Sequence, residues 1–375
     1  MNILATKEKL LRSIQLAEDI ITAKNTMSIL SNILLETIDD MLQITSTDLE
    51  TAIKIHVDAD VKKEGSITVF AKKFADIIRE LPNDDIEIHV DENKYLKIQS
   101  KNDQVKAQFK LIGIPKNDYP ILPEFKKDKS IKVPQNVFKA MIRKSIFSVS
   151  KDDVQVNISG VKLELKNKKL TLVATDARRL SLISYDLDTK TEIDEVIIPQ
   201  KVLSEVLKIL NDEGDMEISV SEKQIYFKID NIELFSRLID GKFPDYQQVI
   251  PQSFKKKAFL FTIKILNAVK RVSIITTEKQ SSKIILKFTK GNLEIKTNDP
   301  DIGEAKESVE NIVYDYDDVF EIAFSSEFLL DALKAVDTEN MIFSMNTGIG
   351  AIAVREENND NFLCLIMPIK LSNAD

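Results

Sequence analysis

Residues 170–176, Leu170-Thr171-Leu172-Val173-Ala174-Thr175-Asp176, form a strand-like stretch that has a counterpart on each side of it in the chain. The counterparts are residues 42–48 (LQITSTD) and 293–299 (LEIKTND), so the closing aspartates stand 128 and 123 residues apart. A period of this length is too long for a solenoid unit and matches a whole small domain. The repeat therefore predicts three like domains in one chain, an arrangement that forms an arc and can close into a ring.

Each repeat consists of two similar halves, and each half contains an amphipathic helix followed by alternating strands. Apolar residues at helical spacing predict helices at 7–21, 71–80, 134–149, 199–211, 262–273 and 325–336. The predicted fold class is α+β, with three similar domains that each pack two helices on antiparallel sheets. We place the domains at residues 1–126 (N-terminal), 127–253 (central) and 254–375 (C-terminal), with polar, lysine-rich linkers at 124–130 and 252–257.

The composition is that of a globular protein with a hydrated surface. The 375-residue chain is 43% apolar and 30% charged, and its nine glycines are too few to favour glycine-rich nucleotide loops. The single Cys364 cannot form an intrachain disulfide, so we expect a reducing, cytoplasmic environment. No secretory signal is expected at the N-terminus, and no run of about 18 apolar residues predicts a membrane span.

Charge is distributed unevenly along the chain. The net charge is −8, yet the six predicted helices together carry +7, which leaves −15 for the remainder. For any one helix, basic residues such as Arg143 and Lys144 are most simply interpreted as ordinary solvated residues. If the six helices share one face, that face is basic on an acidic protein and favours sequence-independent contact with phosphates.

Sequence motifs of nucleotide-dependent and metal-dependent enzymes are absent, since the chain has neither GxxxxGK[ST] nor GxGxxG nor HExxH. We therefore expect a binding protein with no catalysis, cofactor or metal. The recurring Asp48, Asp176 and Asp299 are expected to serve turns. Two alternatives remain open: a carboxylate-dependent metal hydrolase that uses one of these aspartates, and an extended three-domain scaffold that never closes.

Three short motifs carry a family resemblance: residues 174–180 (ATDARRL), 240–246 (DGKFPDY) and 367–371 (MPIKL). With residues 31–35 and 42–50, they make the chain resemble the bacterial DNA polymerase sliding clamp, the beta subunit, along its whole length. The resemblance implies the DNA clamp fold and a head-to-tail homodimeric ring around double-stranded DNA, with helices lining the hole. It also implies three kinds of partner, namely the replicative polymerase, the clamp loader and other proteins that carry a clamp-binding motif.

The resemblance further implies a hydrophobic cleft between the central and C-terminal domains that captures short partner peptides. By motif match, the cleft would be lined by Ile158, Thr175, Ala177, Arg178, Arg179, Leu180, Pro244, Gln248, Val249, Met367, Pro368, Ile369, Lys370 and Leu371. Without the resemblance, the apolar members of this set would be assigned to the core. The chain departs from the family pattern at Ala177-Arg178, where relatives often have Gly-His, and at Gln248 and Lys370, where they have arginine. These departures and the tail 372–375 could alter peptide preference.

Two further surfaces follow from the resemblance. The DNA-facing residues would be Lys24, Lys72, Lys73, Arg79, Lys139, Arg143, Lys201, Lys208, Lys264 and Lys270. The dimer interface would bring Phe109 and Leu111 of one copy against Ile274 and Ile275 of the other. Taken singly, each of these four apolar residues fits an intradomain core equally well.

Overall fold

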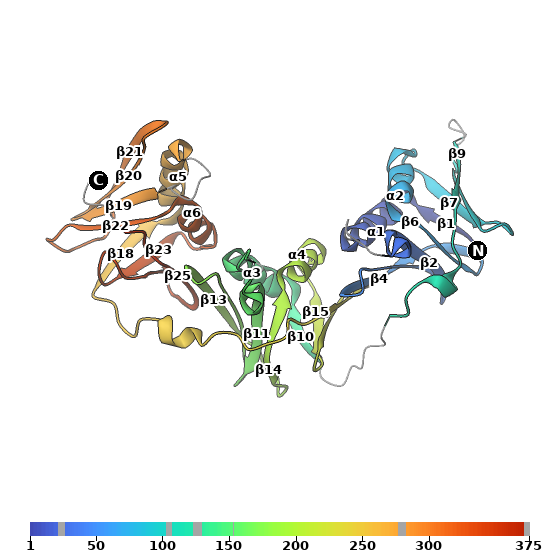
Figure 1. Ribbon diagram of the computed structural model, residues 1–375, viewed down its shortest axis with the longest axis horizontal. Coiled ribbons are helices and arrows are strands. Elements are labelled where there is room, and N and C mark those ends of the chain that lie inside the picture. Colours follow the sequence, from blue (N-terminus) through green and yellow to red (C-terminus); the bar gives the residue numbers. More distant parts are fainter. Residues whose placement is uncertain (22–26, 103–106, 123–129, 153, 277–282, 371–375) are drawn as a thin grey trace. The chain divides into compact units, whose positions relative to one another are not determined.

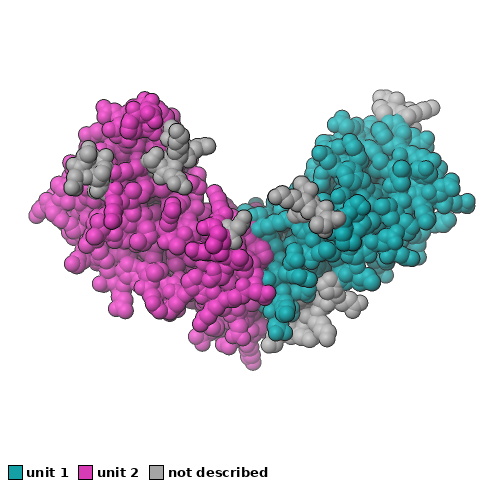
Figure 2. Space-filling model, in the orientation of Figure 1, with its two compact units in different colours: residues 1–136, 201–238 teal, residues 137–200, 239–375 magenta. Residues whose placement is uncertain are grey.

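The computed structural model describes residues 1–21, 27–102, 107–122, 130–152, 154–276 and 283–370. The chain divides into two compact units, which Figure 2 shows in different colours. Unit 1 consists of residues 1–136 and 201–238, and unit 2 consists of residues 137–200 and 239–375. Each unit therefore combines one terminal repeat with part of the central repeat.

Helices occur at each of the six positions that the apolar spacing predicts. They are α1 (Lys7–Ile20), α2 (Ala71–Glu80), α3 (Gln135–Ser145), α4 (Gln200–Ile209), α5 (Thr262–Val272) and α6 (Ser326–Lys334). The predicted end of the third helix at 149 is too late, since α3 gives way to the 3₁₀ turn Ile146–Ser148. Burial follows the predicted stripes, as at Leu10, Ile14 and Ala17 of α1, so each apolar face supports its sheet.

The described residues of unit 1 form two antiparallel sheets. The five-stranded sheet has the order β5-β1-β7-β8-β9 and consists of β1 (Asn2–Thr6), β5 (Asp60–Lys63), β7 (Asp85–Val90), β8 (Tyr95–Ser100) and β9 (Gln108–Ile112). The eight-stranded sheet has the order β10-β15-β16-β17-β4-β3-β2-β6 and consists of β2 (Asn32–Ile38), β3 (Met41–Thr47), β4 (Thr51–Asp58), β6 (Ser66–Phe70), β10 (Ser130–Pro134), β15 (Asp215–Val220), β16 (Gln224–Ile229) and β17 (Ile232–Arg237). Helix α1 contacts β3, and it also contacts α2 and β4 (Figure 1).

The described residues of unit 2 also form two antiparallel sheets. The eight-stranded sheet has the order β14-β11-β12-β13-β25-β24-β23-β18 and consists of β11 (Gly160–Lys166), β12 (Lys169–Thr175), β13 (Arg179–Asp186), β14 (Ile193–Pro199), β18 (Lys256–Phe261), β23 (Asn340–Met345), β24 (Ile352–Glu356) and β25 (Asn359–Ile366). The four-stranded sheet has the order β21-β20-β19-β22 and consists of β19 (Lys283–Thr289), β20 (Asn292–Asp299), β21 (Gly303–Glu310) and β22 (Phe320–Ser325). Helix α5 contacts α6, β20 and β21 (Figure 1).

Each eight-stranded sheet continues from one repeat into the next. In unit 1, β4 of the first repeat pairs with β17 of the central repeat, and Ala52 lies opposite Phe235. In unit 2, β13 of the central repeat pairs with β25 of the last repeat, and Leu180 lies opposite Leu365. We call these two strand pairings the first joint and the second joint. Main-chain hydrogen bonds therefore fasten both boundaries between repeats.

The predicted α+β class with antiparallel sheets is confirmed. The linker predicted at 252–257 is too long, because β18 already begins at Lys256, which lies opposite Met345. Of the linker predicted at 124–130, only Ser130 belongs to the described residues, and it opens β10. None of the helices in the described ranges is long and apolar enough to cross a membrane.

Candidate functional site

The turn between β12 and β13 is built by its own side chains. Thr175 Oγ1 donates to the carbonyl of Arg179 at 2.7 Å and accepts from the N–H of Ala177 at 3.1 Å. Asp176 Oδ1 accepts from the N–H groups of Arg178 and Arg179 at 3.0 and 2.9 Å. Ala177 has φ of +67°, a left-handed conformation that a glycine adopts with less strain. The turn therefore presents residues 177 and 178 outward at the end of the hairpin.

The first repeat contains the same turn between β3 and β4. Thr47 Oγ1 donates to the carbonyl of Thr51 at 2.8 Å and accepts from the N–H of Leu49 at 3.0 Å. Asp48 Oδ1 accepts from the N–H groups of Glu50 and Thr51 at 3.1 and 2.7 Å, and Leu49 has φ of +76°. The structural role expected for Asp48 and Asp176 is thus visible in matching hydrogen bonds.

The metal-hydrolase alternative depends on how the recurring aspartates are surrounded. Asp299 also accepts a main-chain N–H within its own turn, from Asp301 at 3.0 Å. Within the described ranges, no group of three or more histidine, cysteine or carboxylate side chains is arranged to hold a metal ion. Cys364 is buried, and burial raises the pKa of its thiol to about 12, so it is a core residue rather than a reactive thiolate.

Arg179 is the most deeply embedded charged residue of the predicted cleft. It is 4% exposed, and its Nε and Nη1 lie 3.0 Å from Asp176 Oδ2 and 2.8 Å from Asp331 Oδ2. Its guanidinium also lies 4.3 Å from the ring centre of Phe328 on α6. Arg179 therefore fastens the turn to α6 and acts behind the surface rather than on it.

An apolar cluster lies in unit 2 beside this turn. Its buried members are Ile158, Val173, Leu180, Ile197, Phe243, Tyr246, Ala353, Leu363 and Leu365, and Leu182, Ile239, Ile250 and Phe254 pack against it. Of the predicted cleft residues, Ile158 and Leu180 belong to this cluster and are each 3% exposed. Both are therefore core residues by burial, and they can contribute only the floor of a cleft.

The remaining described residues of the predicted cleft are more exposed than the members of that cluster. Those with exposed side chains are Ala177, Arg178, Pro244, Gln248, Val249, Met367 and Lys370, and those that are half-buried are Thr175, Pro368 and Ile369. Val249 and Met367 are apolar, yet 59% and 48% exposed. Exposed apolar side chains are typical of a surface that receives a ligand.

The segment after β25 lies against the turn through its main chain. The N–H of Met367 donates to the carbonyl of Arg178, and the N–H of Ile369 donates to the carbonyl of Ala323, both at 2.8 Å. Pro368 between them has no N–H, and β25 ends at Ile366, consistent with the rule that proline closes a strand. Leu371, predicted to line the cleft, and the tail 372–375 lie outside the described residues.

Several residues of the cluster were not predicted as site residues. Phe243 and Tyr246 belong to the motif at 240–246 and make an edge contact with ring centres 6.5 Å apart. Leu363 and Leu365 lie on β25. The continuous apolar run 362–366 (FLCLI), which is typical of a strand buried on both faces, is the signal that could have identified these two leucines.

The basic residues predicted to face DNA differ in the exposure of their side chains and in whether they form ion pairs. Those with exposed side chains are Lys72, Lys73, Arg79, Arg143, Lys208, Lys264 and Lys270. Arg79 pairs with Asp76 on the same helix at 2.8 Å, and Lys139 is half-buried. Lys24 lies outside the described residues.

Two of these basic residues are engaged at the first joint. Lys201 Nζ lies 2.8 Å from Asp48 Oδ2 and donates to the carbonyl of Ile20 at 3.0 Å. Lys208 Nζ lies 2.8 Å from Asp19 Oδ2 and 3.0 Å from Glu205 Oε2. Their charges are thus neutralised within unit 1, which weakens the expectation that they bind phosphate.

Lys144 does not belong to a basic surface. It is 7% exposed, pairs with Glu356, and lies 3.1 Å from Asp337 Oδ2. The apparent basic run Arg143-Lys144 is therefore one exposed cation beside one buried ion pair. Because helical neighbours point in different directions, charge counts along the sequence overstate the basic face.

The four predicted interface residues lie at the surface. Phe109 and Leu111 are half-buried on β9, the edge strand of the five-stranded sheet. Ile274 is 77% exposed, and Ile275 is half-buried. None of the four is a fully buried core residue, so an apolar contact with another molecule is open to each of them.

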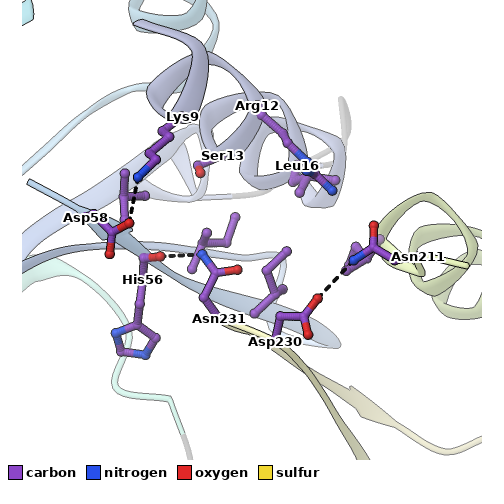
Figure 3. Close-up of a pocket in the computed structure, with 13 residues that line it drawn as sticks. Lys9, Arg12, Ser13, Leu16, His56, Asp58, Asn211, Asp230 and Asn231 are labelled. Atoms are coloured by element: carbon purple, nitrogen blue, oxygen red, sulfur yellow. Dashed lines mark hydrogen bonds and ion pairs between the residues drawn. The ribbon is translucent and has the colours of Figure 1, made fainter. Parts of the chain in front are cut away.

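A polar pocket of about 300 Å³ borders the first joint in unit 1 (Figure 3). Four of its side chains form two pairs. Lys9 pairs with Asp58 at 2.7 Å, and Asn211 donates to Asp230 at 2.9 Å. Because these polar groups are matched within the protein, the pocket fits a role in fastening α1 and α4 to the sheet.

Three like α+β repeats, with sheets that continue across both boundaries between them, define a protein of the DNA clamp class. Residues 1–123, 132–245 and 247–370 match the N-terminal, central and C-terminal domains of the DNA polymerase III beta subunit. The chain is 31% identical to the beta sliding clamp of Bacillus subtilis, over 97% of this chain and 98% of that protein. The chain belongs to the DNA polymerase III beta subunit family.

Solved structures support the same assignment. The sliding clamp of Bacillus subtilis matches with a TM-score of 0.91 and 29% identity, over 99% of this chain and 100% of that chain. A sliding clamp from Pseudomonas aeruginosa, solved bound to griselimycin, matches with a TM-score of 0.91 and 30% identity over the same shares. The family is one of non-catalytic polymerase subunits, so the metal-hydrolase alternative is wrong.

Proposed function

We propose that the chain is a sliding clamp that acts in the cytoplasm. Two copies join head to tail into a closed ring around duplex DNA and tether the replicative polymerase to its template. The observation that carries this proposal is the match to all three family domains along the chain. The mechanism is topological. A basic lining attracts phosphates weakly and without sequence preference, and an acidic exterior repels them.

The partner site is the surface at the second joint. An extended peptide would insert apolar side chains over Leu180 and the cluster beneath it, between Pro244 and Val249 on one side and the segment from Met367 on the other. Polymerase, clamp loader and other clamp-binding-motif proteins would compete for this cleft. Ala177 and Arg178 stand at its rim, where a residue change alters peptide preference without disturbing the floor.

The DNA contacts are assigned to the exposed cations of α2, α3 and α5, namely Lys72, Lys73, Arg143, Lys264 and Lys270. The dimer contact is assigned to β9 and the 3₁₀ turn Ser273–Ile275. Within the described residues, β9 is an edge strand, and with the 77% exposed Ile112 it has the properties of a surface that a second copy covers.

Topological binding distinguishes this function from ordinary electrostatic binding. The protein is loaded on nicked circular duplex with a clamp loader, washed at high salt, and then the DNA is cut with a restriction enzyme. We expect retention on circles and release from linear ends. Equal loss from both DNA shapes under salt would contradict the closed ring and favour the open three-domain scaffold.

The cleft is tested by deleting residues 367–371. We expect the variant to lose binding of a polymerase-type peptide in fluorescence anisotropy while its dimer mass stays that of the parent. Unchanged peptide affinity would contradict the placement of the site, and loss of the dimer would show that the deletion disturbs more than the cleft.

A further inference from the structure

A buried lysine lies beneath one wall of the proposed cleft. Lys162 on β11 has a side chain that is 8% exposed, and its Nζ lies 3.0 Å from both Glu164 Oε2 and Glu195 Oε2. It also lies 5.0 Å from the ring centre of Tyr246. One cation is therefore enclosed by two carboxylates and an aromatic ring at the edge of the apolar cluster.

The two carboxylates continue from Lys162 to the cleft wall. Glu195 Oε1 accepts from the main-chain N–H of Phe243 at 3.2 Å. The hydroxyl of Tyr246 donates to Glu164 Oε1 at 3.4 Å. These bonds hold the segment 243–246 at both of its ends, and the exposed Pro244 lies between them.

The charges of this network persist at neutral pH. Burial lowers the pKa of Lys162, but the hydrogen bonds to Glu195 and Glu164 outweigh burial and leave that pKa above its ordinary value. Burial raises the pKa of Glu195, yet the hydrogen bond and charge of Lys162 outweigh it and leave that pKa below its ordinary value. Burial also raises the pKa of Tyr246, so its hydroxyl remains a donor.

The first repeat shows that the fold does not require this lysine. Lys162 lies opposite Val173, which stands two residues before the turn threonine Thr175. In the first repeat, Leu34 lies opposite Thr45, which stands two residues before the turn threonine Thr47. The first repeat therefore has a leucine where the central repeat buries a cation. Because burying a charge costs free energy that an apolar residue avoids, the lysine is better explained by a task than by stability.

The same register locates the partner of Lys162 in the first repeat. Ile197 lies opposite Lys162 and Thr68 lies opposite Leu34. Glu195 stands two residues before Ile197, beside a register shift in the β11–β14 pairing, and Ser66 stands two residues before Thr68, so Ser66 is the counterpart of Glu195 by position along the strand. The buried Lys–Glu pair thus has Leu and Ser as its counterparts. It occurs in the repeat whose loop forms the proposed cleft wall.

We propose that Lys162, together with Glu164 and Glu195, is a positioning group that fixes the wall segment 243–246 and thereby sets the affinity of the cleft for partner peptides. Lys162 acts through Tyr246 and the main chain of Phe243 and does not touch the peptide. This inference rests on the proposed function of the cleft.

The test transfers the residues of the first repeat into the central repeat, as K162L/E195S in the full-length dimer. The probe is a fluorescent peptide that copies the clamp-binding segment of the organism's replicative polymerase. We expect at least a tenfold weaker affinity in anisotropy with an unchanged dimer mass, whereas K162R retains affinity within about threefold. The matched control is K101L/E87S, which removes an ion pair of unit 1 with a 2.5 Å separation and should leave affinity unchanged.

Hydrogen exchange separates positioning from general destabilisation. In K162L/E195S, the amide of Phe243 should exchange faster while the amides of β12 and β13 keep their protection. If K162L/E195S unfolds, E195Q provides the same test, with faster exchange at Phe243 and weaker peptide binding expected. Unchanged affinity in a folded K162L/E195S, or in E195Q, would overturn the inference. A parent protein that fails to bind the peptide would instead overturn the proposed cleft.

Discussion

The two joints contain the same turn in different surroundings. At the first joint, Asp48 turns the chain and its second oxygen binds Lys201, whose side chain is 39% exposed. At the second joint, Asp176 turns the chain in the same way and its second oxygen binds Arg179, whose side chain is 3% exposed. The hydrogen bonds inside the turn are thus local, whereas the use made of the remaining carboxylate oxygen depends on the surroundings.

The strands that follow the two turns also differ, because the second has larger apolar residues at the matching positions. Ala52 opposite Phe235 at the first joint corresponds to Leu180 opposite Leu365 at the second. Two residues further on, Lys54 of the first joint corresponds to Leu182 of the second, which packs against the apolar cluster. Repetition therefore supplies two equivalent boundaries, and substitution on the sheet surface makes the second of them more apolar.

The largest difference in stability between the joints is expected when the cation that binds each turn aspartate is removed. Arg179→Ala leaves Asp176 and Asp331 without their buried partner and should cost about 3–5 kcal/mol of unfolding free energy. Lys201→Ala removes a partly solvated pair and should cost about 1 kcal/mol or less. Urea unfolding of both variants beside the parent measures the two losses. Equal losses would show that the joints are energetically alike.

The repeat, the helices and the strand alternation were accessible from the sequence because they depend on neighbouring residues. The apolar stripe of α1 and the Thr-Asp turns are local patterns of this kind. The ion pairs were not accessible, since Arg179 meets Asp331 from 152 residues away and Lys144 meets Glu356 from 212 residues away. A sequence pattern shows that a residue is charged, but only the tertiary fold shows whether that charge faces solvent or a buried partner.

The same reasoning explains the partial prediction of the cleft. Motif matching predicted Pro244 and Met367 as cleft residues, and both have exposed side chains. It did not identify Lys162, because a lysine on an alternating strand is most simply placed on the solvent face. Lys162 lies against the ring of Tyr246, which bonds Glu164 from 82 residues away in the sequence.

A smaller effect is expected from relieving the left-handed backbone in each turn. Ala177→Gly and Leu49→Gly remove a side chain from positive φ, which stabilises the fold, but they also loosen the unfolded chain. The net gain should be about 0.5–1 kcal/mol for each, with Leu49→Gly slightly lower because the leucine also loses apolar contact. Denaturant midpoints measure the gains, and Ala177→Val should shift in the opposite direction. A gain at one turn and a loss at the other would break their equivalence.

The smallest effects concern two carboxylates whose pKa values move in opposite directions. In unit 1, burial raises the pKa of Glu205 above 4.5, and Lys208 offsets this only in part. In unit 2, burial acts on Glu195 in the same sense, but Lys162 outweighs it and the pKa falls below 4.5. The folded protein therefore binds the proton of Glu205 more tightly than the unfolded chain does, and the proton of Glu195 less tightly.

The signs of the pH dependence follow from this difference. The contribution of Glu195 is present above pH 4.5 and is lost as the pH falls through its lower folded pKa. The penalty of Glu205 arises as the pH rises from 4.5 through its higher folded pKa. At neutral pH, Glu195→Gln should therefore lower the thermal midpoint and Glu205→Gln should raise it, and both differences from the parent should shrink toward acid pH. Thermal unfolding at neutral and acid pH measures both, and shifts of the same sign would show that Lys162 does not distinguish the two sites.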